Sequence, residues 1–139
     1  MDTMSDANKE AARQLYRRFS EGDLSVIDEV ISDDFVEHEV MPGLEPNKDG
    51  VRQMFGMFRS VFRDAKFEVD GMIAEGDMLF ALVRMKGIHQ AEFMGVPASG
   101  RAIEVGVADY FRFENGKALE HWGVMDTGAL MQQLTGVTA

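Results

Sequence analysis

The stretch LEHWGVMD, residues 119–126, holds the chain's single tryptophan, one of its three histidines and two carboxylates. Asp109, on the strand predicted to precede this stretch, and His121 within it are a candidate pair for proton transfer. A carboxylate and an imidazole that are buried together titrate as a coupled unit, and either can act as an acid or a base near neutral pH. The pair can equally be structural, fixing how the two strands align.

Whether the two side chains share a face of the sheet depends on the turn at residues 114–116. A two-residue Asn-Gly turn pairs Glu114 with Lys117, whereas a three-residue loop with Gly116 in the left-handed conformation pairs Phe113 with Lys117. These registers differ by one residue, so they disagree about which side chains face the core.

We prefer the three-residue loop, because it places Asp109 directly opposite His121 and gives a buried carboxylate the partner that burial demands. The expected inner face consists of Val105, Val107, Asp109, Phe111, Leu119, His121, Gly123 and Met125. The outer face then carries two large aromatic residues, Tyr110 and Trp122. Such a surface predicts a homodimer formed through the sheet.

Composition and charge exclude several classes of function. The chain has 139 residues, no cysteine and a net charge of −10, which argues against a nucleic-acid partner and against an anionic membrane surface. Without cysteine there is no thiolate nucleophile and no disulfide. With no bilayer-length apolar run and no signal peptide pattern, we expect a single cytoplasmic domain spanning residues 1–139. The histidines lack the spacing of metal ligands, so no metal is expected.

The elements that would position the pair are helices first and strands second. Apolar residues at helical spacing predict helices at residues 7–21, at about 49–63 and at 127–134, with a short one between Leu24 and Ile31. Asp126 is expected to cap the last of them. After Asp64 the period changes to two, and the predicted strands are 66–74, 78–87, 89–95, 101–113 and 118–125. This order predicts an α+β fold in which helices cover a mostly antiparallel, curved sheet and enclose a cone.

Methionine and phenylalanine are abundant, at 11 and 10 residues. Such side chains suit an adaptable pocket for a small apolar molecule, although they can also fill a core and leave no cavity. His38 lies in a loop rich in proline and glycine, beside Glu37 and Glu39, and is a candidate for the rim. The expected substrate-binding residues are Tyr16, Phe19, His38, Met54, Phe55, Phe58, Phe62, Phe111 and Gly123.

Four segments of the chain, taken in order, resemble the SnoaL-like polyketide cyclase family of the nuclear transport factor 2-like superfamily. They are GDLSVIDEVISDDFVEH, GIHQAEFMGVPASGR, VADYFRFENGKALEHWGVMD and LMQQL, and the resemblance runs from about Asn8 to Gly136. It implies a cone-shaped α+β barrel, with N-terminal helices over the concave face of a strongly bent sheet, usually dimerised through the outer face. It also implies an intramolecular aldol condensation of a polyketide ester without any cofactor.

In characterised cyclases of this family, an aspartate on the last strand is the acid/base, and a histidine on the preceding strand faces the same pocket. By this resemblance the two positions are Gly123 and Asp109 here. The usual carboxylate is therefore absent, and Asp109 with His121 can supply a relocated one. We expect a cofactor-independent cyclase or isomerase for a small to medium apolar carbonyl compound, with Asp109 as base and His121 as its partner. A carrier or sensor of an apolar ligand, and a dimerisation module with a filled cone, are the alternatives.

Overall fold

The structure is a computed structural model that describes residues 3–39 and 41–136. Its helices are α1 (Thr3–Ser20), α2 (Val26–Val30), α3 (Lys48–Val61) and α4 (Thr127–Thr135). Its strands are β1 (Ile31–Glu37), β2 (Phe62–Glu75), β3 (Met78–His89), β4 (Ala102–Glu114) and β5 (Lys117–Met125). They form a bent sheet in the order β1-β5-β4-β3-β2, in which β1 pairs with β5 in parallel and the other neighbours are antiparallel.

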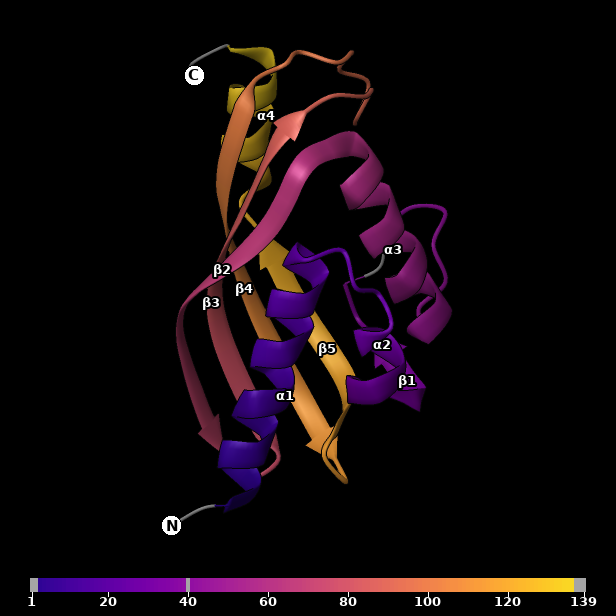
Figure 1. The fold of residues 1–139 in the computed structure, drawn as a ribbon, viewed down its shortest axis with the longest axis vertical. Coiled ribbons are helices and arrows are strands. Elements are labelled where there is room, and N and C mark those ends of the chain that lie inside the picture. The colour runs from indigo at the N-terminus through magenta and orange to yellow at the C-terminus, as the bar shows by residue number, and fades with distance from the viewer. Residues whose placement is uncertain (1–2, 40, 137–139) are drawn as a thin grey trace.

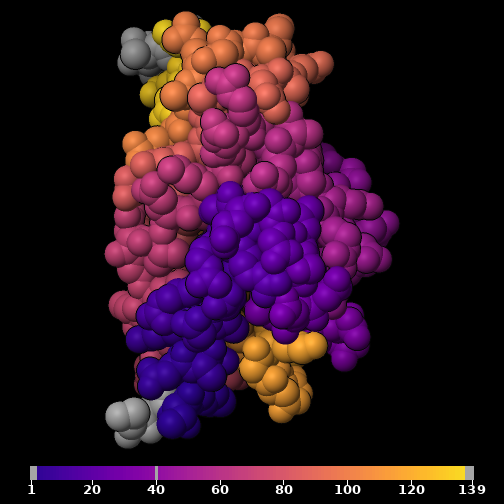
Figure 2. Space-filling view, in the orientation of Figure 1, coloured from indigo at the N-terminus to yellow at the C-terminus, as the bar shows by residue number. Residues whose placement is uncertain are grey.

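The helices cover one face of this sheet, as the predicted α+β class requires. In Figure 1, α1 crosses in front of the strands and α3 lies beside it, whereas α4 packs at the far end, against β4. The space-filling view in Figure 2 shows the N-terminal segments over the middle of this face, with the C-terminal strands emerging at its lower edge. No helix in the two described ranges is long and apolar enough to cross a bilayer.

The two helices that matter for the site form where the apolar periodicity predicted them. Helix α1 buries Leu15, Tyr16 and Phe19, which recur at helical spacing along one face. Helix α3 begins after Asn47, whose side chain accepts a hydrogen bond from the Gly50 amide at 3.1 Å and so satisfies one of the free amides of the first turn. These two amphipathic faces turn toward the sheet and enclose the interior.

Two predictions about the strands are wrong. Residues 31–37 form β1, although Ile31 was placed at the end of a short helix and no strand was predicted before residue 66. Its pairing with β5 is interrupted between Ile31 and Val36, so its buried residues do not alternate as in a regular strand. Residues 89–95 are not a strand: β3 ends at His89, and an isolated bridge between Phe93 and Val96 closes the loop that follows.

The turn between β4 and β5 also differs from the prediction. Glu114 pairs with Lys117, so the loop has two residues and not three. Asn115 and Gly116 have φ values of 52° and 78°. Positive φ at both central residues is the requirement of the type I′ turn that asparagine and glycine favour.

A β-bulge follows immediately after this turn. Ala118 pairs with Phe113 and Glu120 pairs with Arg112, so Leu119 is an extra residue on β5 that has no partner of its own. An inserted residue reverses the facing of every later side chain in the strand. The residues of β5 beyond Leu119 therefore lie on the face opposite to the one that a regular two-residue hairpin would give them.

Because of the bulge, His121 faces inward as the three-residue loop had predicted, although the loop itself has only two residues. Asp109 and His121 both face the helices, but they are diagonal neighbours, since Asp109 pairs with Gly123 and His121 pairs with Phe111. Leu119, which was predicted to face inward, is half-buried and has no cross-strand partner.

Candidate functional site

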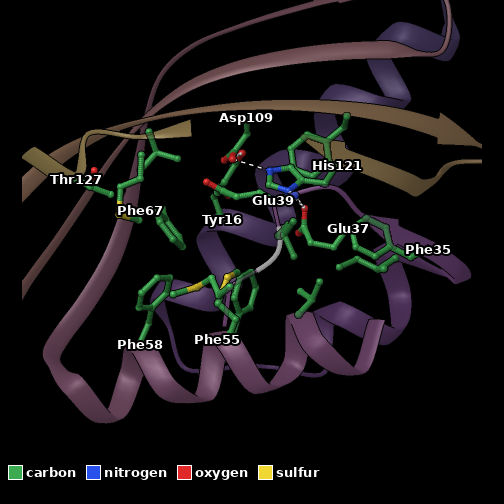
Figure 3. Close-up of a pocket in the computed structure, with 18 of the residues that line it drawn as sticks. Tyr16, Phe35, Glu37, Glu39, Phe55, Phe58, Phe67, Asp109, His121 and Thr127 are labelled. Carbon is green, nitrogen blue, oxygen red and sulfur yellow. Dashed lines mark hydrogen bonds and ion pairs between the residues drawn. The ribbon is translucent and has the colours of Figure 1, made fainter. Parts of the chain in front are cut away.

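A cavity of about 180 Å³ lies between the sheet and helices α1 and α3. Figure 3 shows its two sides, with Phe55 and Phe58 rising from α3 and the polar residues gathered along the sheet. Most of the lining is apolar, and it includes Leu15, Phe35, Met54, Phe67, Phe93, Phe111 and Met125. The polar groups at the sheet side are Tyr16, Glu37, Glu39, Asp109 and His121.

Four of these polar side chains form one continuous hydrogen-bonded chain. The Tyr16 hydroxyl donates to Oδ2 of Asp109 at 2.6 Å, and the other oxygen of Asp109 lies 2.7 Å from Nε2 of His121. Nδ1 of His121 lies 2.6 Å from Oε2 of Glu37. All four residues are buried, and they come from α1, β4, β5 and β1, so the fold brings together segments from both ends of the chain.

His121 is a cation in this arrangement. Burial alone would lower the pKa of its imidazole, but the hydrogen bonds and charges of Asp109 and Glu37 outweigh burial and raise that pKa from 6.5 to about 10. Both ring nitrogens therefore carry protons at neutral pH and donate to the two carboxylates. Burial, followed by the nearby Asp109 carboxylate, raises the pKa of the Tyr16 hydroxyl well above its usual value, so Tyr16 stays a neutral donor.

Glu39 brings a further carboxyl group to the same end of the cavity. Its backbone amide donates to Oε2 of Glu37 at 3.1 Å, while its side chain reaches toward the sheet. Burial raises the pKa of the Glu39 carboxyl, the Asp109 and Glu37 charges add to this, and the positive charge of His121 opposes it. A Cβ atom at Gly123 would lie 2.4 Å from Oε1 of Glu39, so the Glu39 carboxylate occupies the space that glycine leaves open.

The cluster favours proton transfer over metal binding. Glu39, Asp109 and His121 each place one potential ligand atom within 4.8 Å of the others. However, a metal needs an imidazole lone pair, and both nitrogens of the protonated His121 are committed to carboxylates. Binding a cation at one ring nitrogen would require the loss of its proton and of one of these two short hydrogen bonds.

The structure brings several of the predicted site residues together and separates others. Asp109 and His121 line the cavity with Tyr16, Met54, Phe55, Phe58 and Phe111. Phe19 and Phe62, predicted to bind substrate, do not line it: they are fully buried in the core, where Phe19 packs against Phe55 and Phe62 against Phe93. Phe19 belongs to an apolar stripe of α1 that is wider than the part facing the cavity, whereas Phe62 is already the first residue of β2 and not the last turn of the predicted helix.

His38 is not a rim residue, contrary to the prediction. Its ring stacks on Trp122 at 4.6 Å with an interplanar angle of 5°, and its Nε2 lies 3.1 Å from Oε1 of Glu120. The reason is strand alternation, because the His38 amide still donates to the His121 carbonyl and so continues the extended pairing. The same alternation points Glu37 and Glu39 inward. The period of two in EHE was the signal for both carboxylates, and it was missed because β1 was not recognised.

Comparison with known proteins agrees with this architecture. The family model for SnoaL-like polyketide cyclases matches residues 9–134. TsrD from Streptomyces laurentii is 26% identical, with a TM-score of 0.87 over 95% of this chain and 97% of that one. IdmH from Streptomyces antibioticus, a proposed polyketide cyclase, is 30% identical, with a TM-score of 0.82 over 94% of this chain and 99% of its own.

AclR from Streptomyces galilaeus, a proposed hydroxylase, is 25% identical, with a TM-score of 0.83 over 96% of this chain and 99% of its own. No curated protein sequence matches at a significant level. The family match covers most of the chain, and it agrees with the bent sheet and the N-terminal helices. The chain therefore belongs to the SnoaL-like polyketide cyclase family.

Proposed function

We propose that this protein is a cofactor-independent enzyme that performs acid/base catalysis on a small to medium apolar carbonyl compound. The reaction is an intramolecular aldol cyclisation or an isomerisation. The observation that supports this proposal is the buried chain of Tyr16, Asp109, His121 and Glu37 at the polar end of an otherwise apolar cavity. The family and the similarity to IdmH, a proposed polyketide cyclase, point to the same reaction class.

The chemistry needs a base for a proton on carbon and a positive field for the charge that then develops. Removal of a proton next to a carbonyl leaves an enolate, whose negative charge requires stabilisation in a site with little water. The imidazolium of His121 provides that field, and Asp109 holds it in place at 2.7 Å. We therefore assign Asp109 and His121 as the catalytic pair, with the apolar wall of α3 as the binding surface for the substrate.

A carrier of an apolar ligand is the second candidate, because it would use the same wall. Such a carrier gains little from ionised groups inside its pocket. Burying charges costs free energy even when they are paired, and this cavity contains the cationic His121 between two acceptor carboxylates. The presence of this cluster therefore favours an enzyme over a carrier.

The direct test starts from small molecules that copurify with the protein, identified by mass spectrometry. A bound carbonyl compound, or its synthetic precursor, is then incubated with the wild-type protein and with Asp109→Asn. We expect the variant to lose at least about 100-fold in kcat with little change in KM, because the lost interaction belongs to the transition state. Asp126→Asn, at a helix cap outside the cavity, is the matched control. Unchanged turnover in Asp109→Asn, or a ligand that is never converted, would favour the carrier.

A further inference from the structure

We infer that Glu39 is the group that exchanges the proton with the substrate, and that Gly123 is the opening that admits its carboxylate. The inference rests on the proposed acid/base function and makes it more specific. It moves the base from Asp109 to Glu39, and leaves Asp109 as the residue that positions His121.

The first support is the geometry at Gly123. A Cβ atom built there would lie 2.4 Å from Oε1 of Glu39, 3.0 Å from its Cδ and 2.7 Å from Cε1 of His121. No side chain on β5 could start at this position without displacing the Glu39 carboxylate. The Glu39 carboxylate, which comes from the segment after β1, therefore fills the space beside Gly123, and β5 contributes no side chain there.

The second support is that the Glu39 carboxylate is free to react. Both oxygens of Asp109 already accept hydrogen bonds, from Tyr16 and from His121. Within residues 3–39 and 41–136, no side chain or amide donates to the carboxylate of Glu39, which lines the cavity and is only partly buried. A base must offer a lone pair to the substrate. Glu39 can do so without breaking a contact, whereas Asp109 would have to weaken two.

The third support is the charge around Glu39. The ionisable groups that face it are His121 from β5, Asp109 from β4, Glu37 from β1 and the Tyr16 hydroxyl from α1. Burial, Asp109 and Glu37 raise the pKa of Glu39 against the opposing effect of His121. A carboxylate with a raised pKa is a stronger base when ionised and remains able to return the proton afterwards.

Glu39 alone can both take the proton from the substrate and return it. The Glu39 carboxylate takes the proton from the carbon next to a carbonyl, and the C–H electron pair becomes the enolate double bond. In a cyclisation the enolate carbon attacks a second carbonyl, whose oxygen then takes the proton back from Glu39. No electrons leave the substrate, so neither an oxidant nor a reductant is needed, and the product is an isomer of the substrate.

The test uses 5-nitrobenzisoxazole, a neutral aromatic probe that opens to a coloured cyanophenolate when a base removes its C–H proton. The rate is measured from pH 4 to 9 for wild type, Glu39→Gln, Asp109→Asn and the control Glu92→Gln, which changes an exposed carboxylate outside the cavity. We expect Glu39→Gln to lose about 100-fold together with the rise of rate with pH. We expect Asp109→Asn to be slower but to keep that rise.

The outcomes separate the inference from the function on which it rests. Activity in Glu39→Gln within twofold of the wild type, combined with a large loss in Asp109→Asn, overturns the inference and leaves the proposed function standing. A wild-type protein no faster than an equal concentration of acetate contradicts the proposed function itself, and the inference with it.

Moving the carboxylate from position 39 to position 123 tests the role of Gly123. Stability is measured first, without any ligand, and turnover of the probe is measured second. Gly123→Asp alone should be destabilised in urea unfolding, because its side chain collides with Glu39. Glu39→Ala combined with Gly123→Asp removes the collision with Glu39 and leaves the contact with Cε1 of His121. It should therefore be more stable than Gly123→Asp alone and should turn over the probe faster than Glu39→Ala. Gly123→Asp as stable as the wild type would show that Glu39 does not occupy this space.

Discussion

Glu37 and His121 are directly paired residues of the parallel strands β1 and β5, and their side chains meet with Oε2 and Nδ1 2.6 Å apart. The imidazolium is therefore held from both sides, because its other nitrogen binds Asp109. Glu37 belongs to the site as much as Asp109 does, although it comes from the edge strand β1, far from β4 in the sequence.

Glu37→Gln should show how strongly this contact determines the charge of His121. The amide oxygen still accepts a hydrogen bond, but the negative charge is gone. We expect the pKa of His121 to fall from about 10 toward its ordinary value, and stability in urea to fall by about 1–3 kcal/mol. An NMR titration of the His121 ring protons measures the first effect, with Glu92→Gln as the control. A His121 pKa that does not move would mean that Asp109 alone sets it.

The pH dependence of stability follows from the same histidine. The pKa of His121 is higher in the folded protein, about 10, than its ordinary value of 6.5, so the folded state binds this proton more tightly. Its contribution is complete below about pH 6.5 and is lost as the pH rises through about 10, on the order of a few kcal/mol. Urea unfolding between pH 6 and 10 should show this decline. His121→Gln should remove most of the slope, and an equally steep decline in that variant would contradict the assignment.

The charge of the cluster predicts which ligands the cavity rejects. Glu37 and Asp109 together outweigh the single positive charge of His121, and ionised Glu39 adds to the excess. A neutral ester should therefore bind better than the matching carboxylate. Methyl 2-naphthylacetate is expected to bind at least about 10-fold more tightly than 2-naphthylacetate at pH 8, equivalent to about 1.4 kcal/mol, with the gap narrowing at pH 5. Equal affinities at pH 8 in NMR titrations would refute this.

We propose that the outer face of the sheet forms a homodimer. Trp122, Tyr110, Phe80 and Ile73 pair across four neighbouring strands and are 36%, 43%, 40% and 71% exposed, so they form an apolar row. Such a row on a sheet face is typical of a subunit contact. Sedimentation at micromolar concentration should give twice 15.5 kDa.

Tyr110→Lys should convert that species to a monomer without unfolding it, because the side chain lies on the surface. Met4→Lys, which changes an exposed apolar residue of α1 that is 51% exposed, is the control and should leave the assembly intact. A monomeric wild-type protein would refute the proposed dimer.

Periodicity was enough to predict the fold class and part of the apolar lining, since Phe55 and Phe58 line the cavity and Phe62 does not. Helix α3 shows why, because Val51, Phe55 and Phe58 recur at helical spacing and this pattern depends on the segment alone. Strand β1 shows the limit: its parallel partner is far away in the sequence, and its irregular pairing hides the alternation. Glu37 and Glu39 could not be placed in the site without that strand.

The turn predicted for the last hairpin was wrong, but the face predicted for Asp109 and His121 was right. The Asn-Gly sequence indicates the two-residue turn that is observed, whereas the apolar pattern beyond it indicates the opposite face of a regular ladder. The two patterns are compatible because the bulge at Leu119 lies between them. Turn chemistry acts over four residues and burial acts over the whole strand, so neither one by itself indicates an extra residue between them.

That single residue decides which way the last strand faces. If Leu119 joined the ladder instead of bulging, every later residue of β5 would shift by one partner, so His121 would point to the solvent and Trp122 would turn inward. Deleting Leu119 would instead keep His121 opposite Phe111, because the observed pairing already leaves Leu119 out. A register slip of one residue, with no change of sequence, is therefore the smallest step by which this chain could exchange its polar centre for an apolar interior.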